Sequence, residues 1–447
     1  MVYKTPNVYV EEISTFPPSV AEVSTAIPAF IGYTEKTGIG DQLINKPTRI
    51  NSLLDYETLF GNAYASEFSV TESAGVIAPI SPPTLKYLMY YALRMYFDNG
   101  GGSCYIVSVG EYSTSDKTVA NFDAGLKALE KEDEPTLIML TDAVTLGDPG
   151  YYGLCEQALM QCNRLKDRFA IFDVMKEQVD QFRNRIGTAY LKYGAAYSPY
   201  LQTSLNYYYT DDSVTINEDG GTTNSKLTEY NDPQSSLYNT DLYNKIKTEL
   251  AKQRVVLPPS AAVAGVYARV DRDRGVWKAP ANVSLASVLA PTEKITNEEQ
   301  ENLNVDPTAG KSINAIRSFT GKGTLIWGAR TLAGNDNEWR YIPVRRLFNL
   351  IEESIQKATA FVVFESNNTI TWLKVKSLIE SYLEGLWRQG ALAGSTPEQA
   401  FFVNIGLGQT MTAQDILEGS MIVEIGLAAV RPAEFIILKF SHKLQEA

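Results

Sequence analysis

The sequence predicts an α/β fold in which a parallel sheet carries helices on both faces. Strand-like and helix-like stretches alternate between residues 104 and 186, which is the pattern of successive βα units. With 447 residues, 44% of them hydrophobic and 21% charged, the chain is long enough for two or more domains that each bury a core. Both ends of the chain also carry short strand-like stretches beside prolines.

The elements follow from the spacing of apolar residues. Residues 26–33 have the pattern of a buried strand, and residues 85–97 repeat apolar side chains at the three- and four-residue spacing of a helix. The glycines at 100–102 end that helix. The alternating stretch then comprises strands at 104–109, 136–140 and 169–174 and helices at 122–130, 151–165 and 177–186.

The rest of the chain is mixed in character. Residues 201–242 are rich in Tyr, Asn, Asp, Ser and Thr, and we interpret them as an elaboration of the outer surface. A calcium loop is disfavoured there because the D-x-D-x-D-G spacing is absent. Further elements expected from the periodicity are helices at 344–358, 371–389 and 413–418 and strands at 360–364, 401–405 and 421–430.

A terminal strand is predicted at 433–443, and the first half of it is apolar on both faces. Its alternating apolar side chains are Ile436, Leu438 and Phe440 on one face and Phe435 and Ile437 on the other. A strand that is apolar on both faces must be covered on both faces. A second extended stretch, at 7–13, lies between prolines at the other end. Such ends either pair with neighbouring subunits or close the protein's own sheet, and both alternatives stay open.

Composition and charge argue against several classes of protein. A formal net charge of −12 disfavours a nucleic-acid or anionic-membrane partner, because phosphate groups need a basic surface. Cys104, Cys155 and Cys162 form no CxxC pair and suit small core residues in a reducing cytoplasm. The N-terminus lacks the apolar core of a signal peptide, and no apolar run reaches the roughly 20 residues that cross a bilayer.

Enzymatic chemistry is poorly supported by the sequence. Its one histidine, His442, would have to complete any Ser-His-Asp or Cys-His arrangement alone, and no second histidine could share a metal ion. The glycine-rich stretch 321–324 lacks the G-x-x-x-x-G-K-[ST] spacing of a phosphate loop and is interpreted as a turn. We therefore predict no catalytic residue, no cofactor and no metal site. A hydrolase that uses His442 is the alternative.

Opposite charges alternate at Asp271, Arg272, Asp273 and Arg274. One interpretation is a solvated surface network that contributes little to stability. The other is a patch between subunits, in which arginine side chains pair with carboxylates of a neighbour. The sequence alone does not separate the two.

The stretch that contains this charge run is the most distinctive in the chain. Residues 255–282 read V-V-L-P-P-S-A-A-V-A-G-V-Y-A-R-V-D-R-D-R-G-V-W-K-A-P-A-N. The proline pair, the small-residue helix, D-x-x-R-G-V-W and A-P-A-N resemble the signature of contractile tail sheath proteins, the family found in phage tails and phage-like contractile injection systems. Other stretches similar to that family are T-P-N-V-Y-V-E-E (5–12), N-A-I-R-S-F (314–319), W-G-A-R-T-L (327–332), Y-I-P-V-R-R-L (341–347), L-W-R-Q-G-A-L-A-G (386–394), A-F-F-V (400–403) and R-P-A-E-F-I (431–436).

The resemblance implies a fold of two main parts with strand arms at both ends. It implies a subtilisin-like α/β middle domain without catalysis, and an α+β C-terminal sheath domain that the N-terminal segment completes. The expected division is a strand arm and linker at 1–25, a part packing with the C-terminal domain at 26–103, the middle domain at 104–325 with its polar segment at 201–242, the sheath domain at 326–430 and a strand arm at 431–447.

The resemblance also implies a mechanical function. Subunits of this family stack as hexameric rings in a helical tube around an inner tube, and the sheath contracts from a high-energy state to drive that tube through a target membrane. The implied partners are further copies of the chain, possible sheath paralogues, the inner tube protein, and baseplate and terminal cap proteins, with no nucleic acid and no direct membrane insertion. Assembly is expected in the bacterial cytoplasm, in a particle that is then released or anchored in the producer. A phage tail and an injection system both fit the sequence.

Three sets of residues are expected to make contacts between chains. In this family the terminal strands add to a sheet of neighbouring subunits, which assigns that role to Val8, Tyr9, Val10, Ile13, Phe435, Ile436, Ile437, Leu438 and Phe440. The charge run 271–274 is the second set. The third is a weak inner-tube contact from the helix at 371–389 and the turn after it, with Lys374, Lys376, Arg388 and Glu398 as candidates; the apolar side of that helix also fits an ordinary core. The stretches 16–18 and 426–429 are candidate hinges for the arms, and both fit equally well as ordinary residues at the end of a strand.

Overall fold

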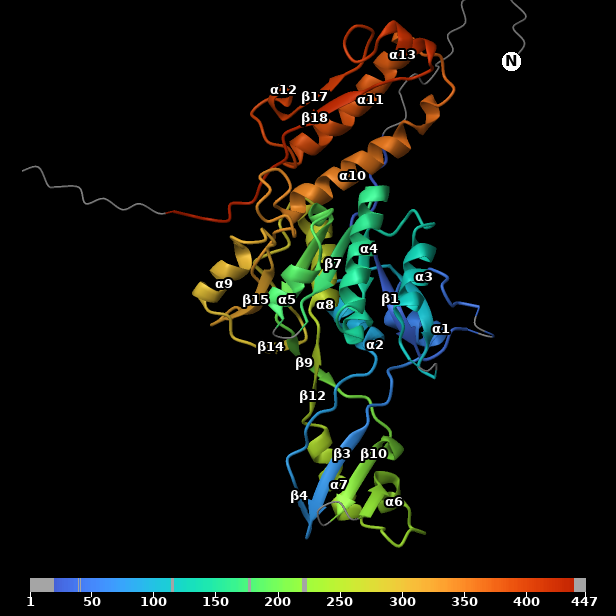
Figure 1. Ribbon diagram of the computed structural model, residues 1–447, viewed down its shortest axis with the longest axis vertical. Helices are drawn as coiled ribbons and strands as arrows, with labels where there is room; N and C mark the ends of the chain where they lie inside the picture. Colours follow the sequence, from blue (N-terminus) through green and yellow to red (C-terminus); the bar gives the residue numbers. More distant parts are fainter. Residues whose placement is uncertain are drawn as a thin grey trace, which may run out of the picture. The chain divides into compact units, whose positions relative to one another are not determined.

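The computed structural model describes residues 20–38, 40, 42–113, 116–175, 178–218 and 223–437. The chain forms two compact units, each with its own helices and strands (Figure 1). The central unit consists of residues 24–350 and 431–447, and the C-terminal unit consists of residues 1–23 and 351–430.

A nine-stranded sheet forms the middle of the central unit. Its strands lie in the order β13-β16-β15-β8-β7-β6-β1-β5-β2. Their bounds, in the same order, are Val283–Ser284, Gly323–Ile326, Asn314–Phe319, Gly194–Ser198, Phe169–Asp173, Leu137–Leu140, Pro28–Thr34, Cys104–Glu111 and Thr48–Ile50. The six strands from β15 to β5 run parallel, which confirms the predicted parallel sheet.

Helices pack on both faces of this sheet (Figure 1). α2 (Met89–Asp98) and α8 (Ser260–Arg274) pack against each other and against β1, β6 and β7. On the other face, α3 (Val119–Leu129) packs against α4 (Gly150–Leu165), and α5 (Val179–Arg185) follows β7. Every residue of β1 and β6 is buried, as expected of strands covered on both faces. The helices predicted between 85 and 186 are therefore confirmed, with small shifts of their ends.

Residues 26–103 belong to the central unit, which corrects the predicted division that packed them with the C-terminal domain. They supply β1, β2 and α2, and β1 lies between β5 and β6 in the middle of the sheet. The parallel sheet cannot form without them. The second boundary also shifts, because residues 326–350 close the central unit and the C-terminal unit resumes at Ile351.

A separate four-stranded sheet lies within the central unit (Figure 1). Its order is β11-β10-β3-β4, with bounds Thr223–Lys226, Val214–Glu218, Phe68–Ser73 and Val76–Ile77. α6 (Leu227–Asn231) packs against this sheet and α7 (Thr240–Leu250) packs against α6. A three-stranded sheet joins β12 (Arg254–Leu257), β9 (Leu201–Asn206) and β14 (Val288–Pro291). The polar segment 201–242 is thus structured, and it pairs with a stretch at 68–77 to which the sequence analysis assigned no element.

The C-terminal unit combines helices with a two-stranded sheet. It contains the second half of α10 (Ile342–Ala358) and the long helix α11 (Thr369–Arg388), followed by the short helices α12 (Pro397–Ala400) and α13 (Ala413–Leu417). β17 (Phe401–Asn404) pairs antiparallel with β18 (Glu424–Leu427). Buried side chains recur along α11 at helical spacing, as its periodicity predicted.

Two predicted strands require comment. The strand predicted at 360–364 is wrong: the chain forms a 3₁₀ turn, η4 (Ala360–Val362), and then places Phe364 at a φ of 70°, which a strand does not accommodate. The terminal strand predicted at 433–443 is described only as far as residue 437. Residues 431–437 pair with no strand of this chain in the described part, so they do not close its own sheet.

The remaining elements are α1 (Leu53–Phe60), α9 (Asn297–Asn304) and the 3₁₀ turns η1 (Ala143–Leu146), η2 (Leu191–Tyr193) and η3 (Asp211–Ser213). α1 and α9 each begin after a serine or threonine whose hydroxyl accepts a hydrogen bond from the first turn, a favourable N-cap. Among the described helices, none is both long enough and apolar enough to cross a membrane.

Candidate functional site

After the last residue of the C-terminal unit, Val430, the chain continues as an irregular segment, residues 431–437, which we call the arm root. Phe435, Ile436 and Ile437 are 70%, 79% and 78% exposed. Consecutive exposed apolar side chains are unfavourable in water and are typical of a surface that another chain covers. The arm root is therefore a candidate contact between subunits.

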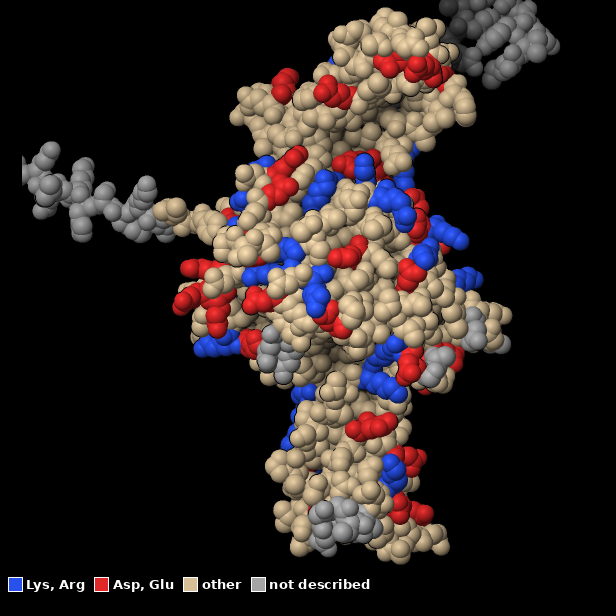
Figure 2. Space-filling view, viewed as in Figure 1, with Lys and Arg blue, Asp and Glu red and all other residues tan. Residues whose placement is uncertain are grey.

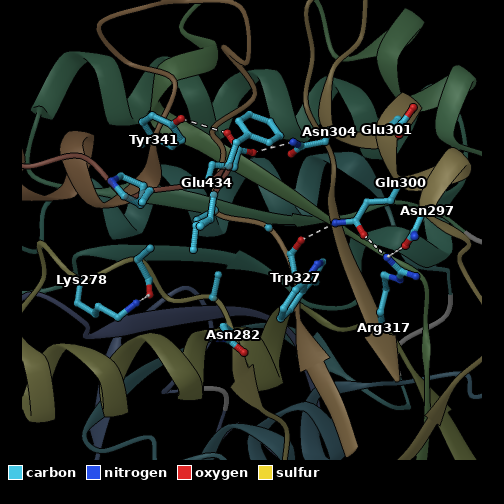
Figure 3. A pocket seen from close by; sticks show the side chains of 18 residues that line it. Lys278, Asn282, Asn297, Gln300, Glu301, Asn304, Arg317, Trp327, Tyr341 and Glu434 are labelled. Atoms are coloured by element: carbon cyan, nitrogen blue, oxygen red, sulfur yellow. Dashed lines mark hydrogen bonds between the residues drawn. The ribbon is translucent and has the colours of Figure 1, made fainter. Parts of the chain in front are cut away.

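A single carboxylate fixes the arm root to the central unit. Glu434 accepts hydrogen bonds from both Nε and Nη2 of Arg330, at 2.9 and 2.7 Å. Nδ2 of Asn304 donates at 2.6 Å and the hydroxyl of Tyr341 donates at 3.1 Å (Figure 3). Together with Arg330, donors from three parts of the chain converge on this group.

The Arg330–Glu434 pair is largely removed from water. The Arg330 side chain is 4% exposed and the Glu434 side chain is 21% exposed. Burial alone would raise the pKa of Glu434, but the hydrogen bonds from Arg330 and Asn304 outweigh burial and hold that pKa below its ordinary value. The carboxylate is therefore ionised at neutral pH, and its bonds to the guanidinium are of the strong, charge-assisted kind.

A pocket of about 520 Å³ lies beside the arm root (Figure 3). Trp327 supplies apolar surface, Lys278 and Arg317 supply positive charge, and residues 432–436 of the arm root form part of the lining. Hydrogen bonds from Arg317 to side chains of α9 fix one side of the pocket. The shape of the pocket therefore depends on where the arm root is held.

The sheet of the C-terminal unit contains only two strands among the described residues, fewer than a stable sheet usually has. In the part of the chain that the structure describes, β17 and β18 pair only with each other, and a two-stranded sheet is marginal on its own. Phe402 is 49% exposed and lies over Gly426 on the facing strand, where a Cβ atom would meet the Phe402 ring. The outer edges of this sheet are therefore candidate positions for further strands.

The hinge expected at 426–429 is corrected by the hydrogen bonds of these residues. Gly426 lies in β18, the N–H of Ala428 donates to the carbonyl of Ala400 at 2.8 Å, and its carbonyl accepts from Ala393 at 2.7 Å. Regular pairing continues to Val430, so the chain becomes free to bend only in the arm root. The hinge predicted at 16–18 and the arm residues Val8, Tyr9, Val10, Ile13, Leu438 and Phe440 lie outside the described residues.

The charge run 271–274 divides into a buried and an exposed part. The Asp271 side chain is 5% exposed and pairs with Arg346, itself 3% exposed, at 2.5 Å. Asp271 is thus part of the core of its own chain, which corrects its assignment to a patch between subunits. Arg272 and Asp273 remain exposed, 3.3 Å apart, and together with the exposed Arg274 they remain candidates for such a patch.

The four predicted inner-tube residues lie in the C-terminal unit but do not form one cluster. Lys376 and Arg388 pair with glutamates one turn away on α11, Lys374 is exposed on the same helix, and Glu398 lies in the first turn of α12. Residues 351–430 contain nine acidic and four basic side chains. On the face shown in Figure 2 this unit carries few charges, mostly acidic.

A buried acid and a serine meet at the end of β7. Ser260, at the start of α8, donates its hydroxyl to Asp173 Oδ2 at 2.5 Å and its N–H to Oδ1 at 2.7 Å. Both residues are buried, 6% and 3% exposed, so the hydroxyl is not presented to a substrate. His442 lies outside the described residues, and in the described part of the chain no cluster of His, Cys, Asp and Glu could hold a metal ion.

This pair predicts a pH dependence of stability. Burial raises the pKa of Asp173 to about 7, although the Ser260 hydrogen bonds oppose the change. A carboxyl group whose pKa is raised by folding stabilises the folded state below its unfolded pKa, and that contribution is lost as the pH rises through about 7. Asp173→Asn should therefore reduce the fall in melting temperature between pH 5 and pH 8. The surface variant Asp123→Asn is the control, and an unchanged pH profile in Asp173→Asn would contradict this prediction.

Together these features are typical of a structural protein that assembles with further chains, because one unit anchors an exposed apolar segment and the other holds a sheet of only two described strands. The phage tail sheath protein central domain matches residues 193–332, and the phage tail sheath C-terminal domain matches residues 334–443. The PVC sheath complex of an extracellular contractile injection system, in the contracted state, is 33% identical with a TM-score of 0.67, over 100% of this chain and 99% of that chain. The chain belongs to the family of contractile tail sheath proteins, which confirms the resemblance seen in its motifs.

Two further sheath proteins are similar to this chain, one along nearly its whole length and one over a third of it. The contracted helical sheath of the anti-feeding prophage is 33% identical with a TM-score of 0.67, over 99% of this chain and 100% of that chain. The tail sheath protein of Enterobacteria phage T4 is 26% identical over 148 residues, which is 33% of this chain and 21% of the phage protein. The matched region thus spans about a fifth of the length of that curated relative.

Proposed function

We propose that the chain is a structural subunit of the sheath of a contractile injection system. Copies of it stack as hexameric rings around an inner tube, and the sheath contracts to drive that tube through a target membrane. The chain is similar to the PVC sheath of an extracellular contractile injection system over 99% of that sheath's length, but to only 21% of the T4 tail sheath protein, which supports an injection system over a phage tail.

The observation that carries this proposal is the complementarity between the arm root and the β17–β18 sheet. The arm root presents exposed apolar side chains without a strand partner in the described chain. Among the described residues the sheet has two strands only, and residues 391–393 pair with the chain beyond β18 but not with β17 or β18 themselves. The C-terminal arm of one subunit and the N-terminal arm of another add to the β17–β18 sheet of a neighbour. Main-chain hydrogen bonds supply affinity in such strand addition, and alternate side chains fill pockets.

Strand addition of this kind is strong enough to hold subunits together while their bodies move. About five main-chain hydrogen bonds per arm, at about 1 kcal/mol net each, give about 5 kcal/mol before side-chain burial is counted. The work of contraction then comes from contacts that are better satisfied in the contracted lattice than in the extended one. No nucleotide is consumed in this scheme.

We infer the other partners from the same scheme. The inner tube is held weakly by the C-terminal unit, with Lys374, Arg388 and Glu398 as the exposed candidates. A terminal cap and possible sheath paralogues complete the particle. A chain in the anti-feeding prophage baseplate structure is 34% identical, which supports a baseplate contact. The particle is assembled in the bacterial cytoplasm and then released or anchored, and the central unit keeps a subtilisin-like fold without catalysis.

Deletion of residues 435–447 tests strand addition directly. We expect the shortened chain to stay folded and monomeric and to form no tubes, because the described part of the deleted stretch, residues 435–437, is exposed and supplies no part of the core. Negative-stain microscopy and sedimentation measure tube formation, and circular dichroism checks folding. The matched control is Leu289→Ser, which removes an apolar side chain of similar exposure, 59%, outside the arm. Long, regular tubes formed by the deletion variant would refute the proposal.

A further inference from the structure

The arm root has a single point of attachment among its described residues. From Arg431 to Ile437, Glu434 alone makes hydrogen bonds with the rest of the described chain. The segment forms neither helix nor strand. Its direction is therefore set at Glu434, since the neighbouring residues have no hydrogen bond that would hold them.

The partner of Glu434 is built into the large sheet. The backbone of Arg330 is held on both sides by the side chain of Asn314, in β15, whose Oδ1 accepts from the Arg330 N–H at 2.8 Å and whose Nδ2 donates to the Arg330 carbonyl at 2.8 Å. The Arg330 guanidinium also donates to the carbonyl of Asn304 at 3.2 Å. Because both the backbone and the guanidinium of this buried arginine are fixed, the carboxylate that binds it is held in one position.

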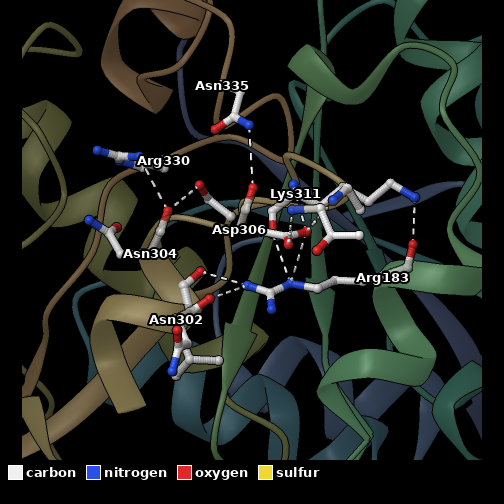
Figure 4. Close-up of polar contacts among 11 residues, drawn as sticks. Arg183, Asn302, Asn304, Asp306, Lys311, Arg330 and Asn335 are labelled. Atoms are coloured by element: carbon white, nitrogen blue, oxygen red, sulfur yellow. Dashed lines mark hydrogen bonds and ion pairs between the residues drawn. The ribbon is translucent and has the colours of Figure 1, made fainter. Parts of the chain in front are cut away.

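A second polar cluster stabilises the end of α9, which carries Asn304, and the loop that follows it (Figure 4). Arg183, on α5, donates to the carbonyls of Asn302, Leu303 and Lys311 at 2.6, 3.1 and 3.1 Å. Asp306 accepts hydrogen bonds from backbone N–H groups within its own loop. The donors that surround Glu434 are thus tied through α5 and β15 to the rigid part of the central unit.

We propose that the Glu434–Arg330 clamp is the fixed point from which the C-terminal arm leaves the central unit, and that it transmits the pull of a neighbouring subunit to the nine-stranded sheet. The inference rests on the proposed exchange of arms. Glu434 acts as a positioning residue: it makes no contact with the neighbour, but it sets where the arm enters the neighbour's sheet. When the clamp is lost, each subunit must order a mobile arm at every assembly step, which raises the concentration needed for assembly.

Glu434→Gln tests the clamp while the arm sequence stays complete. A spin label on Ile436→Cys reports arm mobility, and it reacts selectively because Cys104, Cys155 and Cys162 are all buried. In the unassembled protein we expect the rotational correlation time of the label to fall about threefold in Glu434→Gln. Without the label, the critical concentration for tube formation should rise about tenfold. Tyr341→Phe removes one hydrogen bond to Glu434 and should give smaller changes in the same direction.

Glu249→Gln is the matched control, because it neutralises a glutamate in an exposed ion pair with Lys252 and should change neither quantity. An unchanged label mobility in Glu434→Gln would overturn the clamp. Greater mobility with normal assembly would overturn its role in positioning the arm. Both outcomes differ from a failure of arm exchange itself, which would appear as normal tubes from the chain that lacks residues 435–447.

Discussion

Replacing Asp271 by asparagine is expected to lower the free energy of unfolding of the central unit by about 3–5 kcal/mol, because it leaves a buried guanidinium without its counter-charge. Arg346 and Asp271 make two hydrogen bonds, at 2.5 and 3.0 Å, and their side chains are 3% and 5% exposed. Arg346 also donates to the carbonyl of Thr25 and lies 4.6 Å from the ring of Tyr267. The pair therefore connects the residues just before β1 with α8 and α10 of the central unit.

The chain contains its own control two residues further on. Asp273 is 54% exposed and pairs with Arg272 at the surface, so Asp273→Asn should change stability by less than about 0.5 kcal/mol. Calorimetry of the unassembled protein should show a fall in melting temperature of about 4–7 °C for Asp271→Asn alone. Equal melting temperatures for the two variants would contradict the buried role of Asp271.

The same two variants separate folding from assembly. If the exposed part of the run lies between subunits, Asp273→Asn weakens tube formation at unchanged melting temperature. If it is only a solvated network, tube formation is also unchanged. Since Asp271 is buried, both interpretations of the charge run now concern only the three exposed residues, Arg272, Asp273 and Arg274.

The parallel sheet could be predicted from the sequence because its strands are buried on both faces. β1, β6 and β7 are buried throughout, most of their residues are apolar, and turn residues bound them, which is a strong signal. The stretch 68–77 was missed since its short strands alternate polar and apolar residues and owe their pairing to β10, more than 130 residues away. Sequence periodicity carries no information about such a distant partner.

A run of apolar residues led to a wrong strand prediction where those residues do not enter the core. The residues of 360–364 include Phe361, Val363 and Phe364, all exposed, and the chain turns there because these side chains have no core to enter. The Glu434–Arg330 clamp was missed for a different reason. Both residues stand in motifs that the sequence analysis quoted, but they are 104 residues apart, and nothing local links a glutamate among apolar neighbours to a particular arginine.

Gly265→Ala should be among the most destabilising small substitutions in the protein. Gly265 lies on the face of α8 that packs against α2, and a Cβ atom there would lie 2.4 Å from the backbone oxygen of Tyr96 and 2.9 Å from the Cβ of Asn99. Backbone cannot rotate away as a side chain can, so the two helices must separate. Overpacking of this kind costs about 3 kcal/mol.

Separation of α2 and α8 would also disturb Asn99, which is fully buried. Its side chain donates to the carbonyls of Met95 and Ala286, at 2.8 and 3.2 Å, and accepts from the N–H of Ala286 at 2.8 Å. These bonds fix the end of α2 to a distant loop. The loss of stability caused by a methyl group at Gly265 therefore includes the weakening of the Asn99 hydrogen bonds.

Gly153→Ala should stabilise the protein, whereas Gly265→Ala should destabilise it. The comparison of the two variants shows whether the steric clash at Gly265 is the cause. Gly153 lies within α4, is exposed, and has no atom within 4 Å of the position that a Cβ would take. Alanine there should stabilise the helix by about 0.5–1 kcal/mol, since glycine is the poorer helix former. Thermal and urea unfolding of the unassembled protein measure both variants. If Gly265→Ala were as stable as Gly153→Ala, close packing of α8 on α2 could not be what the small-residue motif provides.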